Sequence, residues 1–492
     1  MSSLLHSRSG ESRLGRHRSP AVTPRWASAQ VTFTSSSAPL ESSVEEPPPL
    51  RQVALVTKFA RLPFWPIWHG LVIMFLDQIG LKTFSQTVEA AIGGRVAPMI
   101  YLPSSRSTEA NDGLSEERGR PRDPDQGPAE GGAGRAEADL LSLSDPFLMN
   151  VHHRHTFFQL DPLRWLQSLV FPEGFPAHPH AGFSTLTYAL KGRMRHRDSL
   201  GVKQIYGDGA AQLLTAGRGV LHEEMWDFSN GRDVELFQIW INLPGRLKGT
   251  KPSLQLVGET DSPDAAGPIS EVTLLSSALS ESSSPPLSPA SPLLPAPSST
   301  RKVVVRILVG EAHGVRARME TLTPQTVLHV SMDAGSSWAF PVPASHTLHV
   351  YVRKGPVDIL VEAGEGRGEN QEGASREKRS PRFVRVETHE TAFTHKGGEL
   401  LQVHCPPVGA GGGPGGEGDF LVLAGEPLGE PVAASGPWVF NDAADAQRAY
   451  ARYQAGVFGL PWGPALDDEA WKAMCDGTGR RSGGREGEGG EA

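Results

Sequence analysis

Short apolar segments alternate with turn-forming residues through most of the chain from residue 144 onward. They include STLTYALKG, VELFQIWINLP, VVVRILVG, TVLHVSM and TLHVYVRKG, which recur between glycine, proline and aspartate signals. Segments of this length that are rich in Val, Ile, Leu, Phe and Tyr predict β-strands, and their regular recurrence predicts a sandwich or barrel. A helical period is clear only in DAADAQRAYARYQAGVF, residues 442–458. The pattern therefore predicts an all-β fold with one short C-terminal helix.

Segments of low complexity divide the predicted strands into two units of similar size. A Ser/Pro-rich linker, residues 259–301, separates the strands of residues 144–258 from those of residues 302–458. A linker of this composition has no means of packing into a core, and two comparable units indicate a duplicated barrel. On composition we also expect residues 41–143 to be an extension and linker that is largely disordered, and residues 459–492 to be a disordered tail.

The N-terminal region has a composition of its own. Residues 1–40 contain five arginines, ten serines and a single acid, Glu11. This profile is typical of a plastid or mitochondrial transit peptide, and the alternative is a disordered basic tail on a cytoplasmic or nuclear protein. Residues 62–76, LPFWPIWHGLVIMFL, are too short and too interrupted by proline to span a bilayer, which needs about 20 apolar residues. Packing of this segment on the core is favoured over a membrane-surface anchor.

Charge and cysteine content narrow the classes of function. The net charge is −8, so the chain lacks the basic character of proteins that hold nucleic acid through its phosphates. The two cysteines, Cys405 and Cys475, are too few for a disulfide framework and do not form a CxxC pair. We therefore expect no direct nucleic-acid binding, and any metal site must use imidazole and carboxylate ligands.

Two histidine motifs in the first unit have the spacing of metal ligands on strands. Alternate residues of a strand point to the same face, so His178 and His180 share one face. In the HEE segment, the same rule pairs His222 with Glu224 and directs Glu223 to the opposite face. Neighbouring strands of one unit would then supply three imidazoles and one carboxylate to a single ion.

This ligand set suits first-row divalent metals. Four protein ligands leave two positions open on an octahedral metal, as oxygen activation or Lewis-acid catalysis requires, whereas a structural zinc site is closed. A redox-active metal makes the best use of open positions. We therefore favour Fe²⁺, although other divalent transition metals remain compatible with the sequence.

Other histidines fit a metal site less well. In HRDSLG, which has the composition of a hairpin turn, His196 could reach the pocket, but a turn or surface position is favoured. His153 and His155 also have i, i+2 spacing, but no carboxylate follows at a matching distance, so a surface or outer-sphere position is expected. His346 and His349 are three residues apart and would face opposite ways on a strand. The second unit is therefore expected to bind no metal.

Several motifs, in their order along the chain, resemble the pirin family of two-domain cupin proteins. They are DPFLM (145–149), GFPAHPHAGF (174–183), HRDSLG (196–201), TAGRGVLHEEM (215–225), LFQIWINLP (236–244) and GEPLGEPVAASGPWVFN (425–441). The resemblance covers about residues 144–258 and 302–458. HPHxGF followed by TAGRGxxHxEM is a specific combination.

The resemblance implies two jelly-roll β-barrels packed face to face, with iron bound in the N-terminal barrel. The resemblance, carried over position by position, implies that the iron ligands are the four residues selected by strand alternation, namely His178, His180, His222 and Glu224. Two positions depart from the family pattern. Ala181 stands where pirins usually carry arginine, and Ser184 where many carry glutamate. Both changes alter the surroundings of the metal and leave the substrate open.

The resemblance also implies two classes of function. Some pirins act as quercetin 2,3-dioxygenases, in which case Glu224 would act as the catalytic base and Phe183, Leu221 and Met225 could line a pocket for a flat aromatic. Others are described as iron-dependent co-regulators of transcription that bind a protein partner. A metal-stabilised barrel without turnover is the third alternative. In each case we expect a monomer.

Overall fold

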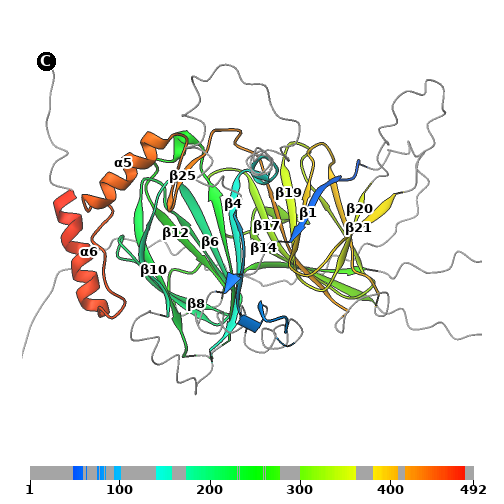
Figure 1. Ribbon diagram of the computed structural model, residues 1–492, viewed down its shortest axis with the longest axis horizontal. Coiled ribbons are helices and arrows are strands. Elements are labelled where there is room, and N and C mark those ends of the chain that lie inside the picture. Colours follow the sequence, from blue (N-terminus) through cyan, green and yellow to red (C-terminus); the bar gives the residue numbers. More distant parts are fainter. Residues whose placement is uncertain are drawn as a thin grey trace, which may run out of the picture. The chain divides into compact units, whose positions relative to one another are not determined.

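The computed structural model describes about three fifths of the chain (Figure 1). The described residues are 48–58, 62–63, 75–76, 78–81, 84, 93–100, 140–157, 173–229, 231, 233–258, 260, 262–276, 300–361, 381–407 and 416–482. All of them belong to one compact unit, residues 48–492. The predicted transit peptide, residues 1–40, and most of the apolar segment 62–76 lie outside the described residues.

The first domain consists of a seven-stranded and a four-stranded antiparallel sheet. In spatial order the larger sheet contains β12 (Ser253–Val257), β9 (Ala210–Thr215), β6 (Phe183–Lys191), β11 (Asp233–Asn242), β4 (Phe147–Thr156), β3 (Gly93–Ile100) and β2 (Leu62–Pro63). The smaller sheet contains β5 (Gly174–His180), β10 (Val220–Asp227), β7 (Arg193–Asp198) and β8 (Lys203–Gly207).

The second domain repeats this pair of sheets. Its larger sheet contains β1 (Val53–Lys58), β22 (Glu390–Thr394), β19 (Thr347–Lys354), β24 (Gly418–Gly425), β17 (Gln325–Met332), β14 (Arg301–Val309) and β13 (Ser270–Ser276). Its smaller sheet contains β18 (Ser337–Pro341), β23 (Leu400–His404), β20 (Val357–Val361) and β21 (Arg382–Val386). The predicted all-β fold with two cupin units is confirmed.

Short elements complete the described fold. They are η1 (Gly245–Leu247), β15 (Glu311–Ala312), β16 (Val315–Arg316), β25 (Ala433–Ser435), β26 (Trp438–Phe440), α5 (Ala443–Gln454) and α6 (Asp468–Ser482). Helix α5 is the predicted C-terminal helix, and the Asp442 carboxylate caps it by accepting a hydrogen bond from the Asp445 amide. Among the described residues, no helix has the length and apolar character needed to cross a membrane.

Strand alternation accounts for the domain interiors. In β14, Val303, Val305 and Ile307 are buried in the core of the second domain, while Lys302 is exposed. The two seven-stranded sheets also share a second apolar cluster, which contains Phe147 and other residues of the first domain together with residues of the second. The sheets therefore pack on each other, as the face-to-face arrangement requires.

A buried polar network joins the two domains within this interface. The Glu235 carboxylate accepts a hydrogen bond from Nε2 of His152 at 2.8 Å, and Nδ1 of His152 accepts from the Tyr351 hydroxyl of the second domain at 2.9 Å. Burial opposes ionisation of Glu235, but the bond from His152 and nearby Arg353 hold its pKa at about 2. A second, equivalent set of contacts has its tyrosine in the first domain and its histidine and carboxylate in the second. The Tyr188 hydroxyl lies 2.9 Å from Nδ1 of His329, and Nε2 of His329 lies 3.0 Å from Oδ1 of Asp419.

Three segments predicted to be disordered contain ordered structure. In the N-terminal extension, β1 pairs with β22 of the second domain and β3 pairs with β4 of the first. Arg51, just before β1, is fully buried and donates to the carbonyl oxygens of His346 and His395. In the predicted linker, β13 pairs with β14. In the predicted tail, residues 468–482 form α6. The sequence did not indicate these ordered parts, because composition does not register long-range pairing and docking.

Candidate metal centre

Strands β5 and β10 lie side by side and bring three of the predicted ligands together. His178 and His222 are directly opposite in the antiparallel pairing, and His180 lies opposite Val220. Each of the three histidines offers one ring nitrogen, and these nitrogens lie within 4.8 Å of one another. Among the described residues this is the one group with the geometry of a metal site. The alternation of side chains along both strands produces it.

The ring nitrogens of this group suit coordination. In the described part of the chain, both nitrogens of His180 and of His222 are buried and have no hydrogen-bond partner. Buried polar atoms are rarely left unsatisfied, so four such nitrogens in one place indicate a missing partner. Nδ1 of His178 lies 2.8 Å from the Pro176 carbonyl oxygen, to which it can only donate. That bond fixes the tautomer and leaves Nε2 available to a metal.

Burial keeps these imidazoles neutral. It lowers the pKa of His180 and of His222 well below the usual histidine value, and the neighbouring imidazoles lower both further. It also lowers the pKa of His178, although the bond to Pro176 and the charge of Glu224 oppose the shift. Neutral imidazole is the form that binds a metal, so protons compete weakly at neutral pH.

Glu224, the fourth predicted ligand, lies outside this group. Its Oε2 accepts a hydrogen bond from Nε2 of Gln238 at 2.8 Å, and Oε1 accepts from the hydroxyls of Thr187 at 2.9 Å and Tyr206 at 3.4 Å. The pairing of β10 with β5 shifts between His222 and Glu224, with the extra residue on β5 between Phe175 and His178. The structure thus brings together three of the four predicted ligands and engages the fourth in hydrogen bonds.

Glu223 points to the other face of β10, as alternation predicts. Its side chain is fully buried, and Oε1 accepts a hydrogen bond from Nε of Arg197 at 2.5 Å. Leu221, on the same face, packs with Trp438 and Phe458 rather than lining a pocket beside the histidines. Alternation places Met225 on that outer face too. The expectation that Leu221 and Met225 line a substrate pocket was wrong, because odd-numbered residues of β10 face outward.

His196 is not a surface residue, contrary to the sequence interpretation. It is fully buried on β7, opposite Glu224 of β10, and its ring centroid lies 5.5 Å from that of His222. Its Nε2 lies 3.2 Å from Oδ2 of Asp198. The turn itself is as predicted, since Oδ1 of Asp198 accepts from the Leu200 amide. The i, i+2 spacing of His196 and Asp198 could have indicated a shared inward face.

The other histidines are also more buried than expected. His153 and His155 are almost fully buried; His153 lies 5.1 Å from the Trp226 ring, and His155 lies 4.0 Å from Phe157. Of the two positions expected for them, the surface one was wrong, because both side chains face the interior of the first domain. His349 is buried in the second domain beside Phe393.

Aromatic side chains flank one side of the histidine group. The Phe183 ring lies 5.1 Å from His180, and the Trp240 ring lies 5.3 Å from it. The two rings lie 4.4 Å apart. Phe183 was expected near the site from the sequence, whereas Trp240 was not, although the polar Gln238 two residues earlier on β11 marks the inward face of that strand.

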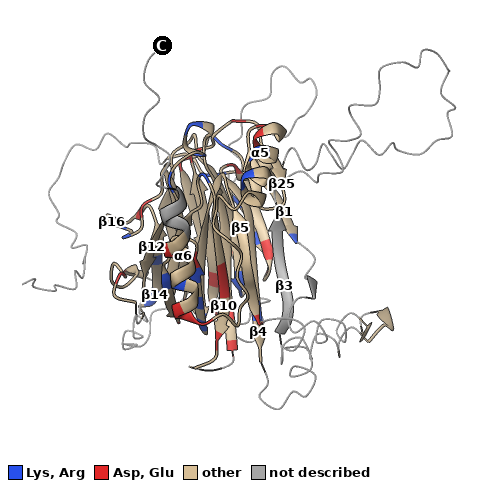
Figure 2. Ribbon diagram, turned by 90° about the vertical axis from the view of Figure 1, so that its left-hand side faces the viewer, with Lys and Arg blue, Asp and Glu red and all other residues tan. Residues whose placement is uncertain are grey.

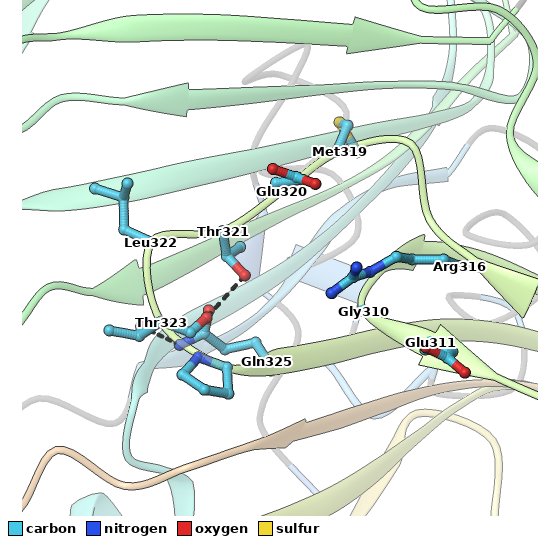
Figure 3. A pocket seen from close by; sticks show the side chains of 10 residues that line it. Gly310, Glu311, Arg316, Met319, Glu320, Thr321, Leu322, Thr323 and Gln325 are labelled. Carbon is cyan, nitrogen blue, oxygen red and sulfur yellow. Dashed lines mark hydrogen bonds between the residues drawn. The ribbon is translucent and has the colours of Figure 1, made fainter.

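A separate pocket lies in the second domain (Figure 3). It has a volume of about 430 Å³ and is lined by residues 310–311, 316 and 319–325, including Arg316, Met319 and Gln325. It contains none of the predicted site residues, so it does not bear on the metal site.

The lowered pKa values of the buried histidines determine how the stability of the metal-free protein responds to acid. Burial lowers the pKa of His180 and His222 well below the usual value and that of His349 to about 3. Unfolded imidazoles titrate near about 6.5, so below that pH the unfolded chain binds protons that the folded chain does not. Stability should therefore fall with pH below about 6.5, by up to about 1.4 kcal/mol per pH unit for each histidine.

Urea unfolding in the presence of a chelator, followed from pH 7.5 to pH 5, checks this expectation. The free energy of unfolding should decrease over that interval, and a saturating divalent metal at pH 7.5 should raise it. A free energy that stays level or rises on acidification would contradict the assignment of buried neutral imidazoles.

Two family models match the chain. The Pirin model matches residues 132–241, and the Pirin C-terminal cupin domain model matches residues 327–459. A solved structure of quercetin 2,3-dioxygenase from Acinetobacter baumannii is similar at 25% identity with a TM-score of 0.47, covering 65% of this chain and 89% of that one.

Several curated proteins are similar over more than half of the chain. A pirin-like protein of Arabidopsis thaliana is 30% identical over 295 residues, which cover 58% of this chain and 76% of that protein. Human pirin is 29% identical over 271 residues, covering 55% and 72%. A protein of Pseudomonas aeruginosa, provisionally named quercetin 2,3-dioxygenase, is 28% identical over 318 residues, covering 64% and 87%. From the two family models and the extent of these similarities, we conclude that the chain belongs to the pirin family.

Proposed function

We propose that this chain is a metal-dependent dioxygenase of the quercetin 2,3-dioxygenase type, with Fe²⁺ as its metal and a flavonol-like aromatic as its substrate. The observation that carries the proposal is the group of His178, His180 and His222, whose neutral, converging ring nitrogens have the chemistry of a divalent-metal site. The Pseudomonas relative supports the choice of reaction by its provisional name.

The residues around the histidines suit an aromatic substrate with an acidic hydroxyl. When bound, a redox-active metal would supply Lewis-acid and oxygen-activating chemistry at its open positions. Phe183 and Trp240 offer ring faces close to His180, against which a flat substrate can stack. Trp240 also carries a buried Nε1–H that has no acceptor among the described residues, so it can donate to a substrate oxygen.

Glu224 is the residue placed to accept the hydroxyl proton. It lies on the same face of β10 as His222, and its charge acts on His178. Hydrogen bonds from Gln238 and Thr187 hold its two oxygens in a fixed orientation. A base must be positioned before its proton affinity matters, so these two side chains contribute to the proton transfer by orienting the carboxylate.

An aerobic assay with quercetin tests the proposal. Protein loaded with Fe²⁺ should consume quercetin, measured as loss of flavonol absorbance with release of carbon monoxide, and Glu224→Gln should lower the rate at least about 100-fold, as expected for loss of a general base. Parallel samples loaded with copper, nickel and manganese test the identity of the metal.

The outcomes of this assay separate the two classes of function. Turnover with another metal but not with iron would overturn the assignment of Fe²⁺ alone. Metal binding without turnover under any of the four metals would overturn the enzymatic proposal, and would favour an iron-dependent co-regulator that binds a protein partner.

A further inference from the structure

The outer face of the strand that carries His222 is covered by the C-terminal end of the chain. We call residues 459–482 the C-terminal strap. It follows the end of the matched cupin model at residue 459 and includes α6. In Figure 2, basic and acidic residues gather where α6 lies over the small sheet that contains β10. The contacts among these residues show how the strap is held.

Glu223 is the centre of the contact between the strap and β10. Its carboxylate is fully buried on the outer face of the strand. Oε2 accepts a hydrogen bond from the indole Nε1 of Trp462 at 2.9 Å, and Oε1 accepts from Arg197 and, at 3.3 Å, from Arg195. A buried carboxylate needs such partners to offset its loss of hydration. Trp462 is therefore a partner of Glu223 supplied by the strap.

Arg197 extends the contact to the rest of the strap. Its Nη1 donates to the Leu466 carbonyl oxygen at 2.7 Å and lies 3.2 Å from Oδ1 of Asp468. Its guanidinium also lies 5.6 Å from the centre of the Trp471 ring. Arg195 adds a bond to the Pro464 carbonyl oxygen at 3.4 Å. Two arginines of β7 and one glutamate of β10 thus bind the strap along its length.

The strap also holds the turn that positions His196. Nζ of Lys472 donates to the Gly201 carbonyl oxygen at 2.9 Å, and Sγ of Cys475 lies 3.5 Å from the Asp198 carbonyl oxygen. Asp198 is the residue whose carboxylate contacts His196 beside the histidine group. The strap therefore contacts both strands, β7 and β10, whose inward faces lie at the candidate metal centre.

We propose that the C-terminal strap is a positioning element for the metal centre, and that Glu223 is the positioning residue through which it fixes β10. The proposal rests on the proposed function, because it assumes that the three histidines bind a metal. Glu223 is the chain neighbour of His222, so the outward contacts of one restrict the backbone of the other. A metal site tolerates displacement of a ligand by only about 0.5 Å, so loosening β10 from outside lowers affinity.

Trp462→Phe tests this positioning with little change in packing. It removes the indole donor to Glu223 and keeps an aromatic ring. We expect the affinity for Fe²⁺ to fall about 10-fold, the lower end of the range for loss of a residue that orients a ligand. We also expect faster amide hydrogen exchange in β10 of the metal-free protein. Calorimetric titration under anaerobic conditions and exchange with mass spectrometry provide the two measurements.

Two further variants of α6 form a matched pair. Asp468→Asn removes a charge that contacts Arg197 and Lys203. It should lower the Fe²⁺ affinity and speed amide exchange in β10, in both cases by less than Trp462→Phe does. Glu469→Gln removes a charge from the adjacent, exposed position and should leave both the metal affinity and the exchange of β10 unchanged.

The outcomes distinguish failure of the strap proposal from failure of the proposed function. Unchanged exchange in β10 of Trp462→Phe overturns the strap proposal whatever the metal does, and so does an unchanged Fe²⁺ affinity. Failure of the unaltered protein to bind any divalent metal overturns the proposed function and the metal part of the strap proposal, while faster exchange in Trp462→Phe would still support the hold of the strap on β10.

Discussion

Replacement of His222 with alanine should lower the affinity for divalent metal more than about 100-fold. Loss of a residue that merely orients a ligand lowers the metal affinity about 10- to 100-fold, so loss of a ligand itself should lower the affinity further. His222 is the central member of the group, since its ring lies 4.3 Å from that of His178 and 4.9 Å from that of His180. Titration of metal-free protein, prepared with a chelator, with Fe²⁺, Ni²⁺ or Mn²⁺ measures the loss of metal affinity.

The matched control is His404→Ala, which removes a half-buried imidazole from β23 of the second domain. His404 contacts Ser337 and is not part of the histidine group, so its loss should leave the metal affinity unchanged. Retention of wild-type affinity by His222→Ala, or equal losses in the two variants, would refute the location of the metal centre.

Replacement of Phe237 with alanine should destabilise the protein by about 3–5 kcal/mol, the usual cost of truncating a buried phenylalanine. Phe237 is fully buried in β11. Its ring stacks on His152 at 4.5 Å and lies 5.7 Å from Tyr351 of the second domain, so the cavity would open between the domains. Denaturant unfolding followed by circular dichroism measures the change in the free energy of unfolding.

Phe383→Ala provides the comparison, because Phe383 lies on β21 of the second domain and is 57% exposed. Its loss should change the free energy of unfolding by no more than about 0.5 kcal/mol, as is usual for surface substitutions. If Phe237→Ala destabilised the protein no more than Phe383→Ala does, the apolar interface between the two large sheets would be disproved.

Strand alternation made the inward faces of single strands predictable. The period of two placed His178 with His180 and sent Glu223 away from His222, and the structure has these orientations. Alternation says nothing about hydrogen-bond partners, and the Glu224 carboxylate accepts hydrogen bonds from Thr187, Tyr206 and Gln238. His196 was missed because its turn-like sequence context concealed that it precedes the turn on an inward-facing strand position.

Contacts between residues far apart in sequence explain why β1 and α6 were not predicted. The six-residue β1 is too short to indicate a strand by itself, and its partner β22 follows more than three hundred residues later. Helix α6 contains Gly477 and Gly479 and has little helical preference of its own. Its docking depends on buried groups elsewhere in the chain, such as Arg197 and Glu223, and composition does not contain that information.

Each end of the described chain packs on the domain that is farther from it in sequence. Strand β1 precedes the first domain in sequence but completes the large sheet of the second, and the strap follows the second domain but covers the first. A cut between residues 258 and 300 would therefore give two fragments that each lack a part supplied by the other. Fragments expressed separately should be unstable alone and should recover their fold on mixing, so the bicupin is an interlocked pair rather than two independent modules.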